Sequence, residues 1–129
     1  MKTDRKNMPT KRAINEHYGR SKLDNCCMAC EHETSLHRAH ITPLVSGGSN
    51  ELGNFHLLCP ICHHESEGWI GDAYTAWYEA RQEGADTDGA YNAALSVVLK
   101  VANERLSQDG LSEGEKRAIE SQIIKQFRG

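Results

Sequence analysis

Aromatic residues are scarce in this sequence: they make up 6% of its 129 residues, and the mean hydropathy is -0.64. A small, polar domain with so thin a core usually needs a metal or a disulfide as a staple. Long apolar runs are missing too. No stretch of about 18 apolar residues occurs, which excludes a transmembrane helix, and the basic N-terminus lacks the apolar segment of a secretory signal. We therefore expect a cytoplasmic protein that does not bind membranes.

Five cysteines are available to form such a staple, and in a reducing cytoplasm they favour metal binding over disulfides. Cys27 and Cys30 form one Cys-x2-Cys pair, and Cys59 and Cys62 form a second, with 28 residues between Cys30 and Cys59. Two such pairs complete a closed tetrahedral site, so the pattern predicts one structural zinc ion. Cys26 could replace Cys27 in a Cys-x3-Cys pair, but we expect Cys26 to be a free thiol. The long segment between the pairs is then an inserted functional loop.

Charge is distributed unevenly along the chain. Residues 1–22 carry seven Lys/Arg against two acidic residues, a net of +5, whereas the remaining residues have a net of -8. A basic arm on an acidic body can hold a polyanion through contacts with its phosphates, so DNA is an expected partner. The alternative is a solvated tail with no partner.

The order of predicted elements is helix, strand, loop, strand and then helices. Pro9 and Thr10 begin a helical pattern that runs to about Tyr18, and Pro60 begins a helix over "ICHHES". Between them, "SLHRAHITPLV" and "FHLL" are predicted strands on either side of the turn-rich "SGGSNELGN". We expect an α+β fold in three parts, namely a basic arm with a short helix (1–22), a zinc-stapled core (23–68) and a C-terminal helical extension (69–129).

The extension from Trp69 onward has apolar residues at helical spacing. "GADTDGA" is a predicted linker, and Ser112 to Glu115 is a predicted capping box before the last helix. These apolar stripes are typical of packing between helices in a core. The alternative is a surface that forms a homodimer, and the sequence assigns no function to this part.

The central segment, "RAHITPLVSGGS" followed by "GNFHLLCPICH" between the two cysteine pairs, resembles the HNH endonuclease family. The shared pattern is a histidine before Ile-x-Pro, a Gly-Gly turn, an asparagine five residues before the third cysteine and a histidine after the fourth. Here these residues are His40, Gly47-Gly48, Asn54 and His63. The resemblance covers residues 27 to about 67 and implies a ββα-metal fold that cuts DNA. Small HNH proteins are frequent in bacterial and phage genomes, so a bacterial or phage-infected cell is the expected setting.

The resemblance also implies a role for each residue. Histidine has an ordinary pKa of about 6.5 and accepts a proton near neutral pH, which suits His40 as the general base. His63 matches a metal-ligand position, and Glu67, four residues later, matches a second one. Asn54 would orient the loop so that His40 points at the attacking water, or would reach the ion. The implied activity is hydrolysis of DNA phosphodiester bonds with a divalent metal such as Mg, Mn or Ni.

One position departs from the family pattern. Ala39 stands where the family commonly has an Asp or His that binds the metal, and its methyl group cannot do so. Side chains alternate along a strand, so His37 lies on the same face as Ala39 and is a candidate for the missing ligand. The alternative is that His37 is a surface residue and that water takes the place of the missing ligand. The departure also favours an alternative function, a non-catalytic zinc module that binds nucleic acid or protein.

Overall fold

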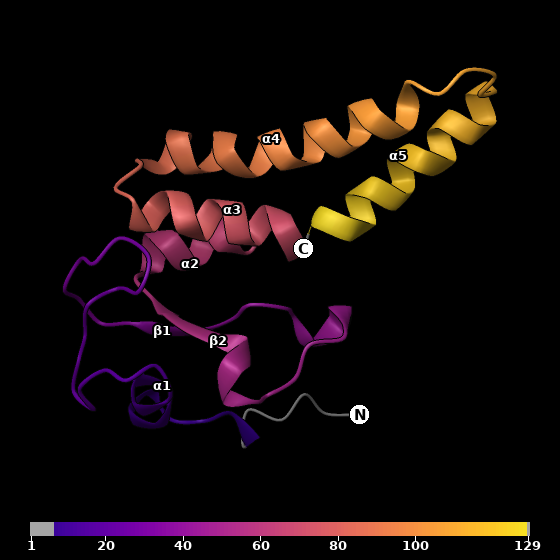
Figure 1. Cartoon of the computed structure of the whole chain (residues 1–129). Helices are drawn as coiled ribbons and strands as arrows, with labels where there is room; N and C mark the ends of the chain where they lie inside the picture. The colour runs from indigo at the N-terminus through magenta and orange to yellow at the C-terminus, as the bar shows by residue number, and fades with distance from the viewer. Residues whose placement is uncertain (1–6, 129) are drawn as a thin grey trace. The chain divides into compact units, whose positions relative to one another are not determined.

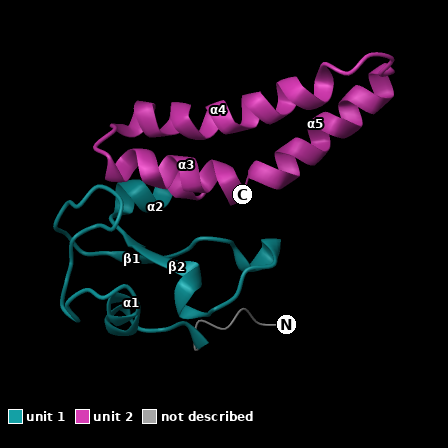
Figure 2. Cartoon of the chain, viewed as in Figure 1, with its two compact units in different colours: residues 1–64 teal, residues 65–129 magenta. Residues whose placement is uncertain are grey.

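The computed structural model describes residues 7–128, which fold as parts of two compact units, residues 1–64 and residues 65–129 (Figure 2). Lys2, Arg5 and Lys6 of the basic arm lie outside the described residues. The sequence predicts three parts, with boundaries after residues 22 and 68. This finer division of the chain stays a prediction.

The first unit holds a two-stranded antiparallel sheet of β1 (His37–His40) and β2 (Phe55–Leu58) (Figure 1). In its register His37 lies opposite Leu58 and His40 opposite Phe55. Helix α2 (Pro60–Ser66) follows directly, which gives the expected order of strand, strand, helix. The predicted α+β fold is therefore confirmed.

Strand β1 is shorter than the eleven-residue stretch predicted from the sequence. After His40 the chain bends, and Pro43 caps a short 3-10 helix, η2 (Leu44–Ser46). The physical reason is that proline has no backbone N–H to donate to a sheet, so pairing stops before it. A second 3-10 helix, η3 (Leu52–Asn54), returns the chain to β2.

Two glycines shape the turn between these short helices. Gly47 ends η2 with φ at +92°, a left-handed conformation that glycine adopts without steric cost. A Cβ atom on Gly48 would overlap the carbonyl oxygen of Thr42. Residues 42 and 48 therefore touch backbone to backbone, and the loop closes on itself directly after β1.

Helix α1 (Lys11–His17) is anchored to β2. The Thr10 hydroxyl accepts a hydrogen bond from the Ala13 N–H at 3.1 Å, which caps the first turn. At the other end, the Tyr18 hydroxyl donates to the Phe55 carbonyl oxygen at 2.6 Å. These contacts fix α1 against the sheet although the helix is too short to be stable alone.

The core of the first unit is small, as the composition predicts. Its buried apolar residues come from α1, the first cysteine pair, both strands and α2. They are Ile14, Cys27, Ala29, Leu36, Ala39, Phe55, Leu57, Leu58, Cys59 and Cys62. Three of the ten are cysteines, so the sulfur atoms are part of what holds this unit together.

The second unit contains three helices, α3 (Gly71–Gln82), α4 (Thr87–Leu106) and α5 (Glu113–Phe127). Trp77, Ile123 and Phe127 are buried among them. The predicted capping box is present, since the Ser112 hydroxyl accepts from the Glu115 N–H and the Glu115 carboxylate accepts from the Ser112 N–H. Within residues 7–128, no helix has the length and apolar character needed to cross a membrane.

The expected linker "GADTDGA" is mostly helical. Asp86 caps α4, because its carboxylate accepts a hydrogen bond from the Gly89 N–H at 2.8 Å. An aspartate at this position satisfies a free N–H of the first turn, so the helix begins at Thr87 despite the glycine.

Candidate functional site: a cysteine cluster and a histidine groove

Four cysteines of the first unit form a metal-binding cluster. The Sγ atoms of Cys27, Cys30, Cys59 and Cys62 all lie within 4.8 Å of one another. The Cys30 and Cys59 sulfurs are 3.8 Å apart. A zinc ion with four Zn–S bonds of about 2.3 Å in a tetrahedron would separate its sulfurs by about 3.8 Å. The cluster is therefore positioned to hold one zinc ion, as the spacing of the two pairs predicts.

Within the cluster, the surroundings favour a thiolate at Cys27, whereas burial raises the pKa of the Cys59 thiol. Hydrogen bonding to Cys62 lowers the pKa of the Cys27 thiol, although burial opposes this, and backbone N–H groups stabilise the anion further. Cys26 lies outside the cluster and pairs with Glu33 in an isolated β-bridge. Burial raises the pKa of the Cys26 thiol. The neighbouring cysteines thus differ in environment, which agrees with Cys26 as the spare thiol.

A groove of about 670 Å³ opens beside β1 in the first unit. Three of the sequence-predicted histidines contribute to its wall, together with two basic and two apolar side chains. Its lining residues are Met8, Lys11, Leu36, His37, Arg38, His40 and His63. The residues therefore come from α1, β1 and α2 and from the segments just before α1 and β1, which are far apart in the sequence.

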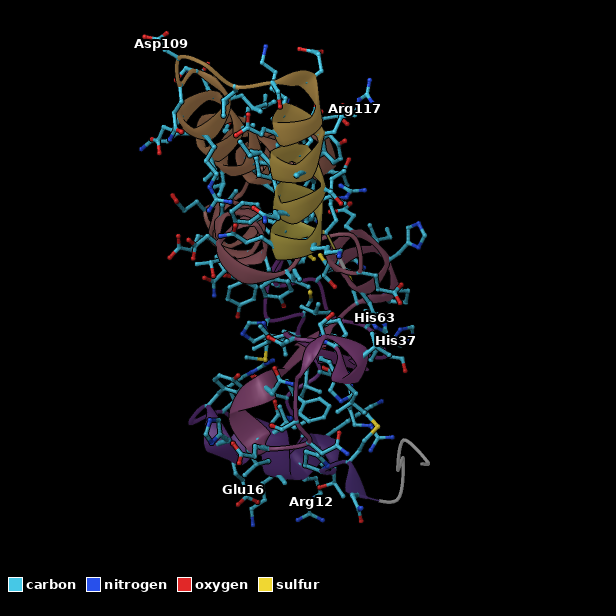
Figure 3. The ribbon with its side chains drawn as sticks, turned by 90° about the vertical axis from the view of Figure 1, so that its right-hand side faces the viewer. Arg12, Glu16, His37, His63, Asp109 and Arg117 are labelled. Atoms are coloured by element: carbon cyan, nitrogen blue, oxygen red, sulfur yellow. The ribbon has the colours of Figure 1, made fainter. Side chains whose placement is uncertain are left out.

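His37 and His63 meet at one side of this groove (Figure 3). Their Nδ1 atoms are 2.9 Å apart, and the rings meet edge to face with centroids 5.0 Å apart. Two nitrogens at this distance fit adjacent positions around one ion, because metal–nitrogen bonds of about 2.1 Å at a right angle place the nitrogens about 3.0 Å apart. This pair is the arrangement expected if His37 replaces the ligand that Ala39 lacks.

His40 occupies the end of β1 and is half-buried. Its Nε2 lies 2.9 Å from Asn50 Oδ1, and its ring packs on the ring of Phe55 with centroids 4.4 Å apart. The His40 ring is therefore held on one face and at one nitrogen. The remaining nitrogen, Nδ1, makes no hydrogen bond to any residue between 7 and 128.

Asn54 lies behind the loop. Its Oδ1 accepts from the Thr42 N–H at 2.9 Å, and its Nδ2 donates to the carbonyl oxygens of Thr42 and Ser49 at 2.9 and 2.8 Å. One side chain thus makes three hydrogen bonds across the loop from Thr42 to Ser49. Of the two roles considered for Asn54, this geometry supports the fixing of the loop that follows His40.

The remaining candidate positions lie elsewhere. Glu67 is exposed and follows the last residue of α2, so it is not part of that helix. Ala39 is 1% exposed and faces His56 across the sheet. His64 is exposed on α2 and is not among the groove residues. The structure therefore gathers His37, His40 and His63, and it leaves Glu67 outside the groove.

Sequence reasoning missed three residues of this site. Asn50 contacts His40 from the turn-rich loop, and Lys11 and Arg38 add positive charge to the groove. Arg38 also donates to the Pro9 carbonyl oxygen at 3.1 Å, which ties β1 to the segment before α1. The charge of residues 1–22 was a usable signal for Lys11. No spacing rule in the sequence points to Asn50, since only folding brings the loop back to His40.

Comparison with known proteins agrees with this geometry. No curated protein and no solved structure matches the chain. The model of one protein family does match, over residues 26–67, the stretch that contains the cysteine cluster, both strands and α2. That family is the HNH endonucleases, so the resemblance of this stretch to the family, predicted from the sequence, is confirmed.

Proposed function

We propose that this protein is a metal-dependent endonuclease that hydrolyses DNA phosphodiester bonds. The observation that carries the proposal is the groove itself: His40 and the His37–His63 pair open onto the same space, next to Lys11 and Arg38. Hydrolysis of a phosphodiester requires a base for the water, neutralisation of the phosphate and help for the leaving oxygen. The groove offers a candidate for each requirement.

His40 acts as the general base in this proposal. It takes a proton from a water molecule, whose oxygen attacks the phosphorus while the bond to the 3'-oxygen breaks, leaving a 5'-phosphate. Packing on Phe55 and the contact with Asn50 hold the imidazole in one orientation, which lowers the entropic cost of the step. Lys11 and Arg38 would contact the negatively charged phosphates.

His37 and His63 would hold the catalytic metal ion, of which Mg, Mn and Ni are the candidates. Their Nδ1 atoms lie 2.9 Å apart, and ligation by both would need both lone pairs, so in each neutral ring the proton would lie on Nε2. A bound divalent ion would act as Lewis acid at the phosphate and the leaving oxygen. The four-cysteine cluster is separate, and its zinc ion would be structural.

The test of this proposal is plasmid nicking by the full chain with Mg, Mn or Ni. We expect His40→Ala to lower kcat by about a hundredfold or more, while DNA affinity and zinc content stay close to those of the wild type. His63→Ala should instead weaken metal binding, and high metal concentration should partly restore cleavage. Cleavage by His40→Ala at the wild-type rate would rule out the proposed base.

A non-catalytic zinc module that binds nucleic acid or protein is the second candidate. The observation in its favour is Ala39, a buried methyl group where a metal ligand is expected. This function predicts that the wild type binds DNA with the salt dependence of phosphate contacts but nicks no plasmid with any of the three metals.

A further inference from the structure

Asn50 is the only side chain between residues 7 and 128 that lies within hydrogen-bond distance of the His40 ring. It is not one of the residues that carry the HNH resemblance, and it lies in the loop between η2 and η3. Its amide oxygen is 2.9 Å from His40 Nε2. Because this contact involves the proposed base, its chemistry bears on how the base works.

An amide oxygen can only accept a hydrogen bond, so His40 Nε2 must carry the proton in this contact. A neutral imidazole has one N–H, and its second nitrogen then carries a lone pair. In His40 that second nitrogen is Nδ1, which makes no hydrogen bond to the residues that the structure describes. The contact therefore leaves Nδ1 able to accept a proton from water.

The loop that carries Asn50 is itself fixed from both ends. Asn54 donates to the carbonyl oxygen of Ser49, the residue just before Asn50, and it holds Thr42 by two further hydrogen bonds. Thr42 is two residues from His40 along the chain. Asn54 therefore closes the loop, and Asn50 touches the ring, so the two asparagines have different tasks.

We infer that Asn50 is the positioning residue that keeps His40 in the Nε2–H tautomer and presents Nδ1 as the basic nitrogen. This inference rests on the proposed function for its kinetic consequence, but the tautomer itself is a property of the folded chain. The reverse orientation of the amide would let Asn50 Nδ2 donate to His40 Nε2. That arrangement would place the proton on Nδ1 and leave that nitrogen without a lone pair, so the two arrangements predict opposite tautomers.

The first measurement is ¹⁵N NMR of the zinc-loaded full chain at a pH where His40 is neutral. Protonated and lone-pair ring nitrogens resonate in separate ranges, and the His40 signals are assigned by their loss in His40→Gln. We expect the wild type to carry the proton on Nε2 and Asn50→Ala to show a mixture of both tautomers. A wild-type His40 protonated on Nδ1 would overturn the inference, whether or not the protein cleaves DNA.

The second measurement is the pH profile of plasmid nicking for two Asn50 variants. Asn50→Ala should lower kcat by about a hundredfold with a KM changed less than about twofold. Asn50→Asp keeps an acceptor oxygen and should recover most of that loss. Its carboxylate stabilises imidazolium, so the acid limb of kcat/KM should move upward by about one pH unit or more. A merely structural asparagine would leave that limb in place.

Asn103→Ala is the matched control, because Asn103 is an exposed asparagine on α4. It should leave both the tautomer and the pH profile unchanged. Absence of nicking by the wild type with every metal would refute the proposed function while the NMR result still decides the tautomer. Nicking by the wild type together with unchanged kcat and an unmoved acid limb in both Asn50 variants would refute the inference alone.

Discussion

On the proposed function, single residues decide whether a metal can bind in the groove. In the first unit, His37 and His63 bring two Nδ1 atoms to 2.9 Å from each other, although His37 is not a motif position. The alternation of side chains along β1 was enough to predict that His37 could stand in for Ala39. The sequence could not predict the distance, because it depends on how α2 leaves the end of β2.

The first prediction concerns His37. On the proposed function, His37→Ala removes one of two adjacent ligands and should raise the Mn concentration for half-maximal nicking by about tenfold to a hundredfold. His64→Ala is the matched control, since His64 is the neighbour of His63 on α2 but does not line the groove. Titration of nicking against Mn measures both variants. Equal Mn requirements for His37→Ala and His64→Ala would mean that His37 is not a ligand.

Side chains whose spacing the family pattern defines were easier to predict than side chains that only folding brings together. His40 and His63 could be identified from the sequence because the family pattern fixes their spacing, and the structure brings both to the groove. Asn50 could not, since its relation to His40 exists only once the loop has closed. Glu67 was expected one helical turn from His63, and it directly follows the last residue of α2 and is not among the residues that line the groove, so its role as a ligand stays a prediction.

At the scale of elements, the cysteine cluster joins the hairpin around Cys27 to the segment that begins α2. Three of the four cysteines, Cys27, Cys59 and Cys62, are buried in the small core of the first unit, so an ion bound by the cluster is expected to hold these segments together. We predict that Cys59→Ser loses the zinc and unfolds the first unit, because binding energy at such a site is folding energy. Zinc content and circular dichroism measure this, and chelation should have the same effect on the wild type.

Cys26→Ser is the control for the cluster. Cys26 is adjacent to Cys27 but lies outside the group of four sulfurs. This variant should keep about one zinc ion per chain and the wild-type melting temperature. Loss of zinc from Cys26→Ser with retention in Cys27→Ser would show that the Cys-x3-Cys pairing is the correct one.

Helix α1 brings positive charge to the groove. Lys11 is exposed and lines the groove, whereas the neighbouring Arg12 lies at the far end of the first unit from His37 and His63 (Figure 3). If the groove takes DNA, Lys11→Ala should make the dependence of log K on log salt shallower by about 0.9, the value for one lost phosphate contact. Binding isotherms at several salt concentrations measure this slope. Arg12→Ala removes the same charge from the chain, so an equal effect of both variants would point to net charge rather than to the groove.

At the scale of the whole molecule, acid should weaken the fold. Burial lowers the pKa of His56 to about 4, from an ordinary value of 6.5. Between these values the unfolded chain binds a proton at this ring and the folded chain does not. The contribution of the neutral His56 ring to the free energy of unfolding is therefore complete above pH 6.5. It falls as the pH is lowered toward 4, by at most about 1.4 kcal/mol per pH unit.

Urea unfolding at pH 7.5, 6.5 and 5.5 with zinc in excess measures this dependence. His56→Gln cannot be charged, so its free energy of unfolding should fall less steeply with acid than that of the wild type. Parallel curves for the two proteins would mean that His56 contributes nothing to the acid sensitivity and that the thiolates alone account for it.

The fold of the first unit could be predicted largely from the residues that begin its helices and from its cysteine pairs. Thr10, Pro60 and the two Cys-x2-Cys pairs mark where elements begin, and the observed bounds follow them. For the second unit, the helices could be predicted from the spacing of apolar residues, but the sequence assigns no function to them. Tyr91 and Leu99 on α4 are 48% and 57% exposed. A homodimer through the C-terminal helices remains a prediction.

The closed loop after β1 has a consequence for genetics. Any side chain at Gly48 would collide with the Thr42 backbone and force apart the segment that Asn54 holds together. A Gly48→Ala protein would keep every histidine, every cysteine and every charge, and yet its His40 would lose the alignment that Asn50 gives it. In a screen for inactive variants, this substitution would be indistinguishable from loss of the base, although no reactive group had changed. On the proposed function, a missense allele at Gly48 would therefore have the same effect as a catalytic knockout.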